Sequence, residues 1–317
     1  MEIVDRFGLR LALIEPAELD REPWTRTDRP LDVVRMPNPP ARLWDELARR
    51  GFVRKPAVVT WAGDAGPDDD AYLAGLGRYP RRAVRRARRD ARRAGLRETV
   101  EDPVTPRSLD RFLELYRERV GAMRFGVPFA LDYRDAVLHG PRRFFGVFAW
   151  EGDELAGGCL VLECPAVDTL VLRFSAVSAR WRRASLARVL YLTALAEGRR
   201  RGYTRATLGN EPNLLGHLTR PGLLVFKSEL GFRPVPSHEF ADPGAQDEAD
   251  LVLRLDSLAD PALILGYPDP TTPHAEARLV PHVFHVTPVD ATRYTAPNLA
   301  PPILHPVPRT TPATAGR

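Results

Sequence analysis

The chain has 317 residues, of which 44% are hydrophobic and 27% are charged, and its formal net charge is +5. This composition suits a soluble globular protein, long enough for two domains or for one domain with extensions. No apolar run reaches the roughly 18 residues of a membrane span, and no secretory signal follows Met1, so we expect a cytoplasmic protein without a membrane partner.

Residues 1–70 are predicted to form a partial N-terminal αβ unit. The first part is proline-rich, with one strand expected at Leu9–Ile14. A helix over Ala41–Arg50 then leads through Gly51 to a strand over Ala57–Trp61, and a loop rich in Gly, Pro and Asp follows.

Residues 71–95 are predicted to form an arginine-rich helix. Arg81 to Arg93 holds eight arginines, while Ala83, Ala87, Ala91 and Ala94 recur at helical spacing. The alanine stripe would pack closely on another element and leave the guanidinium groups outside. Such a helix could bind the phosphates of a tRNA or of a phosphate-rich small substrate; the alternative is a solvated helix without a ligand.

Residues 96–255 show the pattern of a mixed sheet, and residues 256–317 form a proline-rich C-terminal extension. The expected elements are a helix (Thr105–Arg119), a hairpin (Phe144–Trp150 and Leu155–Leu162), a strand (Thr169–Val177), a helix (Ser185–Arg201), a strand (Arg205–Leu208), a helix (Leu218–Leu230) and a closing strand (Ala249–Leu255). Three strands in meander order followed by alternating helix and strand predict an α/β (α+β) fold, its sheet covered by helices on both faces. The extension would pack on the body or stay partly disordered.

A basic segment, Arg180-Trp181-Arg182-Arg183, comes directly before the helix that begins at Ser185. The N–H groups at a helix N-terminus bind phosphate, so this arrangement predicts a site for a phosphate-bearing donor. The alternative is a surface helix capped by the serine and flanked by solvated arginines.

The order of these elements resembles a GNAT acyltransferase domain over about residues 96–255. Three segments make the chain similar to the Fem/BioF2-like (FemAB-like) branch: the basic helix at 79–95, the hairpin Phe148–Gly158, and Gly222–Lys227 leading to Gly231-Phe232. That branch includes aminoacyl-tRNA-dependent enzymes that form peptide bonds.

The resemblance implies an N-acyltransferase in which a small-molecule or peptide amine attacks the acyl group directly. The co-substrate would be an acyl-CoA such as acetyl-CoA, or an aminoacyl-tRNA, in which case the 81–93 helix is a candidate surface for the tRNA. An alternative of a different class is a catalytically inactive GNAT-like module that binds RNA or protein. No metal is expected, since His282 and His285 alone do not make up a ligand set.

The resemblance also assigns donor-binding residues. The pyrophosphate loop of the family matches Arg182 to Ala187, so that Arg182, Arg183, Ser185 and Ala187 would bind the donor. Ser185 stands where the family has glycine and lacks the conformational freedom of that residue. A backbone N–H of residues 176–178 would polarise the acyl carbonyl, with Val177 as the central choice.

The catalytic candidates are Lys227 and Glu211. Lys227 is one of only two lysines and lies four residues before Gly231. Many GNAT enzymes have a tyrosine at this position, whereas Fem-like proteins resemble this chain in having a lysine there. A protonated lysine there would stabilise the oxyanion or the leaving group. Glu211 would accept the proton of the amine, and Asn210, Glu229 and His217 are further candidates.

Overall fold

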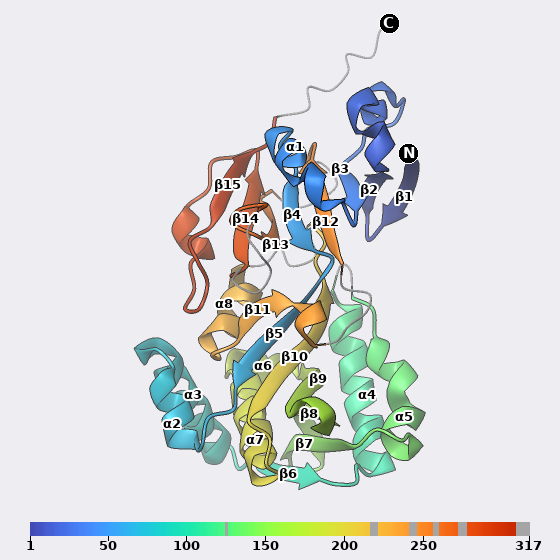
Figure 1. Ribbon diagram of the computed structural model, residues 1–317. Helices are drawn as coiled ribbons and strands as arrows, with labels where there is room; N and C mark the ends of the chain where they lie inside the picture. Colours follow the sequence, from blue (N-terminus) through green and yellow to red (C-terminus); the bar gives the residue numbers. More distant parts are fainter. Residues whose placement is uncertain (124–125, 216–220, 241–245, 256–259, 272–277, 309–317) are drawn as a thin grey trace, which may run out of the picture. The chain divides into compact units, whose positions relative to one another are not determined.

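The computed structural model describes residues 1–123, 126–215, 221–240, 246–255, 260–271 and 278–308 (Figure 1). It contains two compact units. Unit 1 consists of Met1–Thr60, Asn210–Ser228 and Arg233–Arg317, and unit 2 consists of Trp61–Gly209 and Glu229–Phe232. Unit 1 therefore gathers residues from both ends of the chain, whereas the sequence suggests consecutive segments.

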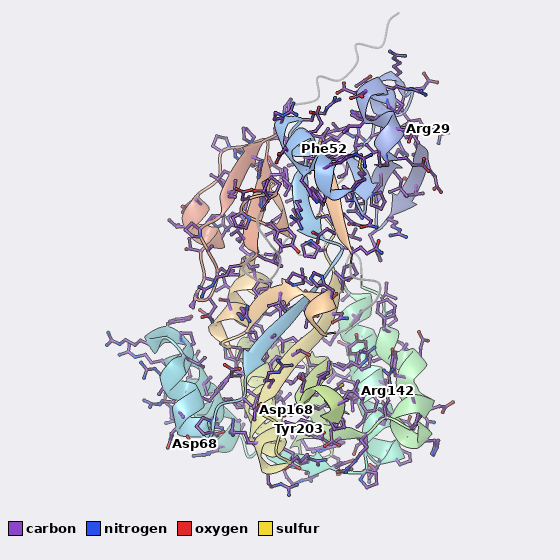
Figure 2. The ribbon with its side chains drawn as sticks, viewed as in Figure 1. Arg29, Phe52, Asp68, Arg142, Asp168 and Tyr203 are labelled. Atoms are coloured by element: carbon purple, nitrogen blue, oxygen red, sulfur yellow. The ribbon has the colours of Figure 1, made fainter. Side chains whose placement is uncertain are left out.

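Unit 1 contains a five-stranded sheet and a three-stranded sheet. The first has the order β1 (Glu2–Arg6), β2 (Leu9–Leu13), β3 (Val33–Pro37), β12 (Asp247–Val252) and β4 (Val53–Pro56), and the second has the order β13 (Ala262–Gly266), β14 (Val280–His285) and β15 (Ile303–Pro306). The short helix α1 (Trp44–Arg49) lies between β3 and β4 in the chain. Phe52 follows it and packs edge-to-face on Trp24 in a buried apolar cluster (Figure 2).

The sequence misplaced one strand of this unit and did not predict several others. The closing strand expected at Ala249–Leu255 is β12, which pairs antiparallel with β3 and β4 and so completes the sheet of unit 1. The described part of the extension after residue 256 packs on the body, one of the two possibilities predicted for it, and forms the unpredicted strands β13, β14 and β15. In both cases apolar residues are buried against partners far away in the sequence, which composition alone does not reveal.

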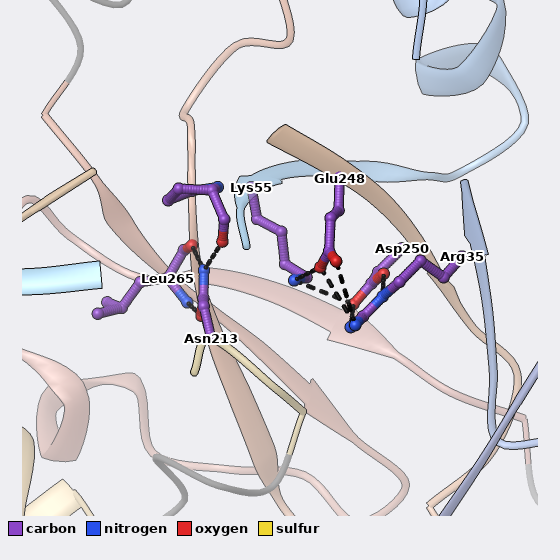
Figure 3. A network of polar contacts seen from close by, with 7 residues as sticks. Arg35, Lys55, Asn213, Glu248, Asp250 and Leu265 are labelled. Carbon is purple, nitrogen blue, oxygen red and sulfur yellow. Dashed lines mark hydrogen bonds and ion pairs between the residues drawn. The ribbon is translucent and has the colours of Figure 1, made fainter. Parts of the chain in front are cut away.

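Strands β3, β12 and β4 carry a buried charged network (Figure 3). Asp250 lies opposite Arg35 on β3 and accepts from its Nε and Nη2 at 2.7 and 2.8 Å. Glu248 lies opposite Lys55 on β4 and accepts from its Nζ at 2.5 Å. Burial, and then the charge of Arg35, lowers the pKa of Lys55; burial opposes ionisation of Asp250, but Arg35 and Lys55 outweigh it and lower its pKa. One of the two lysines in the chain is thus held inside a network with balanced charges.

We predict that Lys55→Met lowers the free energy of unfolding of unit 1 by about 3–5 kcal/mol, because it leaves Glu248 and Asp250 short of a buried cation. Denaturant unfolding followed by circular dichroism measures the change. Arg21→Met, at an exposed position, serves as the control and should leave the midpoint unchanged. Equal midpoints for the two variants would contradict the role given to the network.

A seven-stranded mixed sheet has the order β11 (Arg233–Pro236), β5 (Val58–Asp64), β10 (Arg205–Pro212), β9 (Thr169–Val177), β8 (Glu154–Cys164), β7 (Phe144–Glu151) and β6 (Arg97–Glu101). The unit boundary falls within β5 and β10, and β6 to β9 belong to unit 2. The hairpin β7–β8 and the strand β9 have the places predicted from the sequence, whereas β1, β3, β4, β6 and β11 were not predicted.

Helices cover both faces of the unit 2 sheet. These are α2 (Asp69–Gly75), α3 (Arg78–Arg93), α4 (Pro106–Gly121), α5 (Arg134–His139), α6 (Ala179–Arg183) and α7 (Leu186–Arg200), while α8 (Pro221–Glu229) follows β10. On one face Phe112 of α4 packs on Phe148 of β7, and a Cβ at Gly158 would collide with both rings. On the other face α7 approaches so closely that a Cβ at Gly198 would collide with Leu170 of β9. The prediction of an α/β fold with helices on both faces is confirmed.

The helix predicted over residues 71–95 is instead two helices, α2 and α3, which are separated at Leu76 and Gly77, and α3 buries a different stripe from the one expected. Asp68 caps α2 by accepting the N–H of Ala71 (Figure 2). The buried residues of α3 are Pro80, Val84, Ala87 and Ala91, whereas Ala83 is half-buried and Ala94 is exposed. The larger Val84 and Pro80 therefore replace two of the alanines in the buried stripe of α3, which packs against α7.

Candidate functional site

Strand β9 is paired along one edge and only partly along the other. It pairs antiparallel with β8 from Thr169 to Val177. Its parallel pairing with β10 joins Arg205–Thr207 to Thr169–Val171 and extends no further, although the structure describes both strands beyond that point. β10 changes direction soon afterwards at Gly209, whose φ is +78°. Beyond Val171, the second edge of β9 is left without strand partners in β10.

The free edge of β9 presents backbone donors. The N–H of Ser178, directly after β9, donates to the carbonyl oxygen of Ala156 on β8. Because N–H groups alternate between the two edges of a strand, those of Val177 and Ser175 point away from β8 and toward the edge that β10 has left. Val177, predicted to polarise the acyl carbonyl, therefore lies with its N–H on the open edge.

The short helix α6 follows β9 and is the basic segment that the sequence suggested as a turn. Trp181 is buried, and its Nε1 donates to Glu151 at 2.9 Å. Arg180 pairs with the same carboxylate at 2.8 Å. Arg182 and Arg183 are exposed, and neither pairs with a carboxylate of the described residues. The helix is thus anchored by its first residues and presents the last two arginines to solvent.

Ser185 joins α6 to α7 in the left-handed conformation, with φ of 59° and ψ of 32°. That conformation is the one for which glycine is favoured, so the serine retains the backbone geometry of the residue it replaces in the family pattern. Its side chain makes no capping hydrogen bond, so the cap that the alternative interpretation assumed is not formed. A left-handed residue instead redirects the chain so that α7 can begin directly after α6.

The first turn of α7 supplies further donors. Arg188 N–H donates to the carbonyl oxygen of Ser185, which leaves the amides of Leu186 and Ala187 at the helix start, where no intrahelical acceptor precedes them. Ala187 is half-buried and small. Arg182, Arg183, Ser185 and Ala187 therefore lie together around one helix N-terminus at the carboxyl end of β9.

Strand β9 contains a bulge. Leu160 is opposite Phe174 and Val161 is opposite Leu172, so Arg173 is an extra residue on β9. At Ala176 and Val177 the pairing with β8 is regular. Sequence reasoning also missed Arg173 as a functional candidate, although an arginine within the apolar run Leu170–Phe174 was the available signal.

Lys227 and Glu211 lie together in unit 1. Lys227 is buried, and its Nζ donates to Oε1 of Glu211. Oε2 of Glu211 is buried and accepts no hydrogen bond from the described residues. Both lysines of the chain are therefore buried and paired with a glutamate.

The further base candidates have other partners or lie outside the described part of the chain. Asn210 accepts a hydrogen bond from Thr60 at 2.5 Å. Glu229 accepts from the buried Arg188 at 2.5 Å. His217 lies outside the described residues.

His282 contacts His305 rather than His285, which lies closer to it in the sequence. His282 contacts His305 at 2.9 Å through Nδ1 and the carbonyl oxygen of Tyr267 at 3.0 Å through Nε2, while His285 takes no part in these contacts. Burial lowers the pKa of His282 to about 4. No group of three or more metal-binding side chains, and no helix able to cross a bilayer, occurs among the residues that the structure describes.

Helix α3 exposes many guanidinium groups. Arg88 pairs with Asp69 at 2.7 Å, and Arg86 lies 3.6 Å from Asp90 on the same helix. Within the described ranges, no carboxylate pairs with the following exposed arginines: Arg78, Arg82, Arg85, Arg89, Arg92 and Arg93. These six form the basic face of α3.

Comparison with known proteins agrees with this geometry. Residues 79–213 match the family described as an acetyltransferase (GNAT) domain. This part of the chain therefore resembles a GNAT acetyltransferase domain. The matched range includes β9, α6, α7 and Glu211, whereas Lys227 lies beyond its end. A comparison with curated proteins found no match.

Several solved structures are similar to this chain. The crystal structure of FemX has a TM-score of 0.44 and 15% identity, over 77% of this chain and 81% of that chain. The C-terminal domain of a protein named as a lysylphosphatidylglycerol synthetase, from Agrobacterium fabrum, has a TM-score of 0.39 and 13% identity, over 69% and 67%. An aminoglycoside acetyltransferase from an uncultured soil metagenomic sample has a TM-score of 0.28 and 16% identity, over 34% and 72%. The predicted GNAT resemblance is confirmed, and a Fem protein is among the similar structures.

Proposed function

We propose that the protein is an N-acyltransferase that moves an acyl group from an acyl-CoA-type donor to an amine. The observation that supports this most strongly is the arrangement at the end of β9, within the segment that matches the GNAT family. An open strand edge, two exposed arginines, a left-handed residue and a helix N-terminus follow one another over residues 175–187.

The donor would be held by its phosphates. The amides at the start of α7 offer N–H groups and the positive end of the helix dipole to an anion. Arg182 and Arg183 would add charge-assisted hydrogen bonds, which are stronger than those between neutral groups. Ser185 and Ala187 would keep the backbone accessible. The acyl arm would then extend along the open edge of β9.

In the chemical step the amine nitrogen attacks the acyl carbon, so that a C–N bond forms and the thioester C–S bond breaks. The N–H of Val177 would stabilise the oxyanion, and loss of one such donor typically costs about 2.7–4 kcal/mol of transition-state stabilisation. The amine loses one proton, for which Glu211 is the proposed acceptor, and the departing thiolate gains one. Lys227 is proposed to supply positive charge during this step.

We predict that acetyl-CoA binds to the protein, and that Arg182→Gln/Arg183→Gln weakens binding by about tenfold or more, because neither side chain can then make a charge-assisted hydrogen bond to a phosphate. Ser185→Gly should retain binding, whereas Ser185→Val, with a β-branched residue at positive φ, should weaken it. Calorimetric titration measures each affinity. The matched control is Arg107→Gln/Arg111→Gln on α4, which removes the same charge elsewhere and should bind as the wild type. A folded wild type that gives no binding heat would refute the donor assignment.

Lys227→Ala is expected to lower thiol release from acetyl-CoA at least tenfold. The loss of one oxyanion stabiliser typically lowers kcat by roughly 10²–10³, which sets the upper end of the expected range. Because this change leaves Glu211 with an unpaired buried oxygen, circular dichroism must show that the variant is folded. Lys227→Ala/Glu211→Gln removes the orphaned charge and provides the folded alternative. Near-wild-type turnover in either folded variant would remove Lys227 from the mechanism.

A second candidate donor is an aminoacyl-tRNA, as the Fem-like resemblance implies. The observation that favours it is the basic face of α3, whose six arginines have no carboxylate partner among the described residues. Incubation with charged tRNA, with and without RNase, followed by mass spectrometry separates the donors. An RNase-sensitive product would assign tRNA, and release of a thiol from acetyl-CoA would assign an acyl-CoA. RNA binding without either product would indicate an inactive binding module.

If α3 binds RNA, we expect that Arg82→Gln/Arg85→Gln/Arg89→Gln weakens binding and lowers the slope of log affinity against log salt. The slope should fall by about 0.7 for each phosphate of a single strand that the variant no longer neutralises. Filter binding over a salt series measures both quantities. Arg107→Gln on α4 is the control. Affinity that persists at high salt, or that is absent at low salt, would contradict an RNA-binding role for α3.

A further inference from the structure

Arg173 is the extra residue of the bulge in β9. Two residues of a bulged strand, here Arg173 and Phe174, lie opposite one residue of the partner strand, Leu160. This re-aims Arg173 so that it shares a face with its neighbour. Phe174 packs in the cluster beneath α4, and the guanidinium of Arg173 lies 5.3 Å from the Phe174 ring and 4.6 Å from the Tyr133 ring.

The guanidinium of Arg173 has no counter-charge among the described residues. Its Nη2 donates to the neutral hydroxyl of Tyr133 at 2.6 Å, and no carboxylate of the described chain forms an ion pair with it. Its Nε is buried and has no acceptor in that same part of the chain. Buried donors without a partner are rare in folded proteins, so the described residues leave part of the hydrogen-bonding capacity and all of the charge of this guanidinium unmatched.

The position of Arg173 relates it to the reaction. It lies two residues before Ser175, whose N–H is on the open edge of β9, and after Val171, where pairing with β10 ends. The opposite face of β9 is closed by α7, since the hydroxyls of Ser175 and Tyr191 are in contact at 2.6 Å. An amine that approaches the acyl carbon from the α4 face would pass beside Arg173 and Tyr133.

We propose that Arg173 binds a carboxylate of the amine acceptor and that Tyr133 positions its guanidinium. This inference rests on the proposed function and defines its substrate class as amines that carry a carboxylate, such as amino acids. A planar guanidinium with free N–H donors matches the two oxygens of a carboxylate. The contacts with the Tyr133 and Phe174 rings and the hydrogen bond to the Tyr133 hydroxyl hold the guanidinium in place, and an ammonium group would not offer the same planar fork of donors.

The test uses amines with and without a carboxylate: L-phenylalanine against phenethylamine, and L-lysine against cadaverine. Donor-free binding is measured by saturation-transfer NMR, and turnover by thiol release from acetyl-CoA. The wild type should prefer the carboxylate member of each pair. Arg173→Gln should raise the Kd and KM for that member about 10–100-fold, with kcat little changed and the decarboxylated member unaffected. Arg107→Gln should behave as the wild type.

Two further variants keep the test valid if Arg173→Gln does not fold. Arg173→Lys retains the charge without the fork and should recover only part of the preference, and Tyr133→Phe should raise the Kd of the carboxylate member by less than Arg173→Gln does. Equal binding within each pair, or an equal loss for both members in Arg173→Gln, would overturn the proposal. Phosphoethanolamine bound in preference to the amino acids would overturn the carboxylate assignment. If none of the four amines promotes thiol release, the proposed function fails, while the donor-free binding still decides for or against the carboxylate site.

Discussion

The arrangement of unit 2 depends on one strand, β9, that is fully paired on one edge and only partly paired on the other. Buried backbone N–H and C=O groups need hydrogen-bond partners. A strand that pairs with one neighbour over only part of its length therefore has N–H donors without strand partners at a defined place. β8 holds β9 in position up to Val177, while β10 leaves after Thr207. The close approach of Gly198 to Leu170 fixes α7 against the same strand. The open edge is therefore rigidly supported from the side and from the face.

The end of β9 determines where the donors of the next elements lie. Glu151, at the turn of the β7–β8 hairpin, holds Trp181 and Arg180, and so anchors α6 directly after the strand. The left-handed Ser185 then allows α7 to start at once. A non-glycine residue in this conformation costs roughly 1–3 kcal/mol, and such strain is concentrated where proteins bind ligands. A single covalent segment thus brings strand donors, arginines and helix donors together.

Much of this segment could be predicted from the sequence because its signals are local. The strand over Thr169–Val177 has the predicted bounds, and α7 begins and ends within one residue of the predicted helix. These elements are recognisable because apolar alternation and helical periodicity are properties of neighbouring residues. The positive φ of Ser185 could not be inferred from the residue type, since serine favours other conformations.

Features that depend on distant partners could not be predicted either. β12 pairs with β3 and β4, and almost 200 residues of chain separate Glu248 on β12 from Lys55 on β4. The sequence of a short strand does not indicate which distant strand it pairs with. The bulge at Arg173 depends on the register with β8, and the pairing of Lys227 with Glu211 depends on how α8 packs.

Amide hydrogen exchange with and without saturating acetyl-CoA tests the central claim most directly, because it reports on the donors themselves. The account predicts slower exchange for Ser175, Val177, Leu186 and Ala187 in the presence of acetyl-CoA. Unchanged exchange at these four amides, with acetyl-CoA demonstrably bound, would show that the donor does not lie along β9 and at the start of α7.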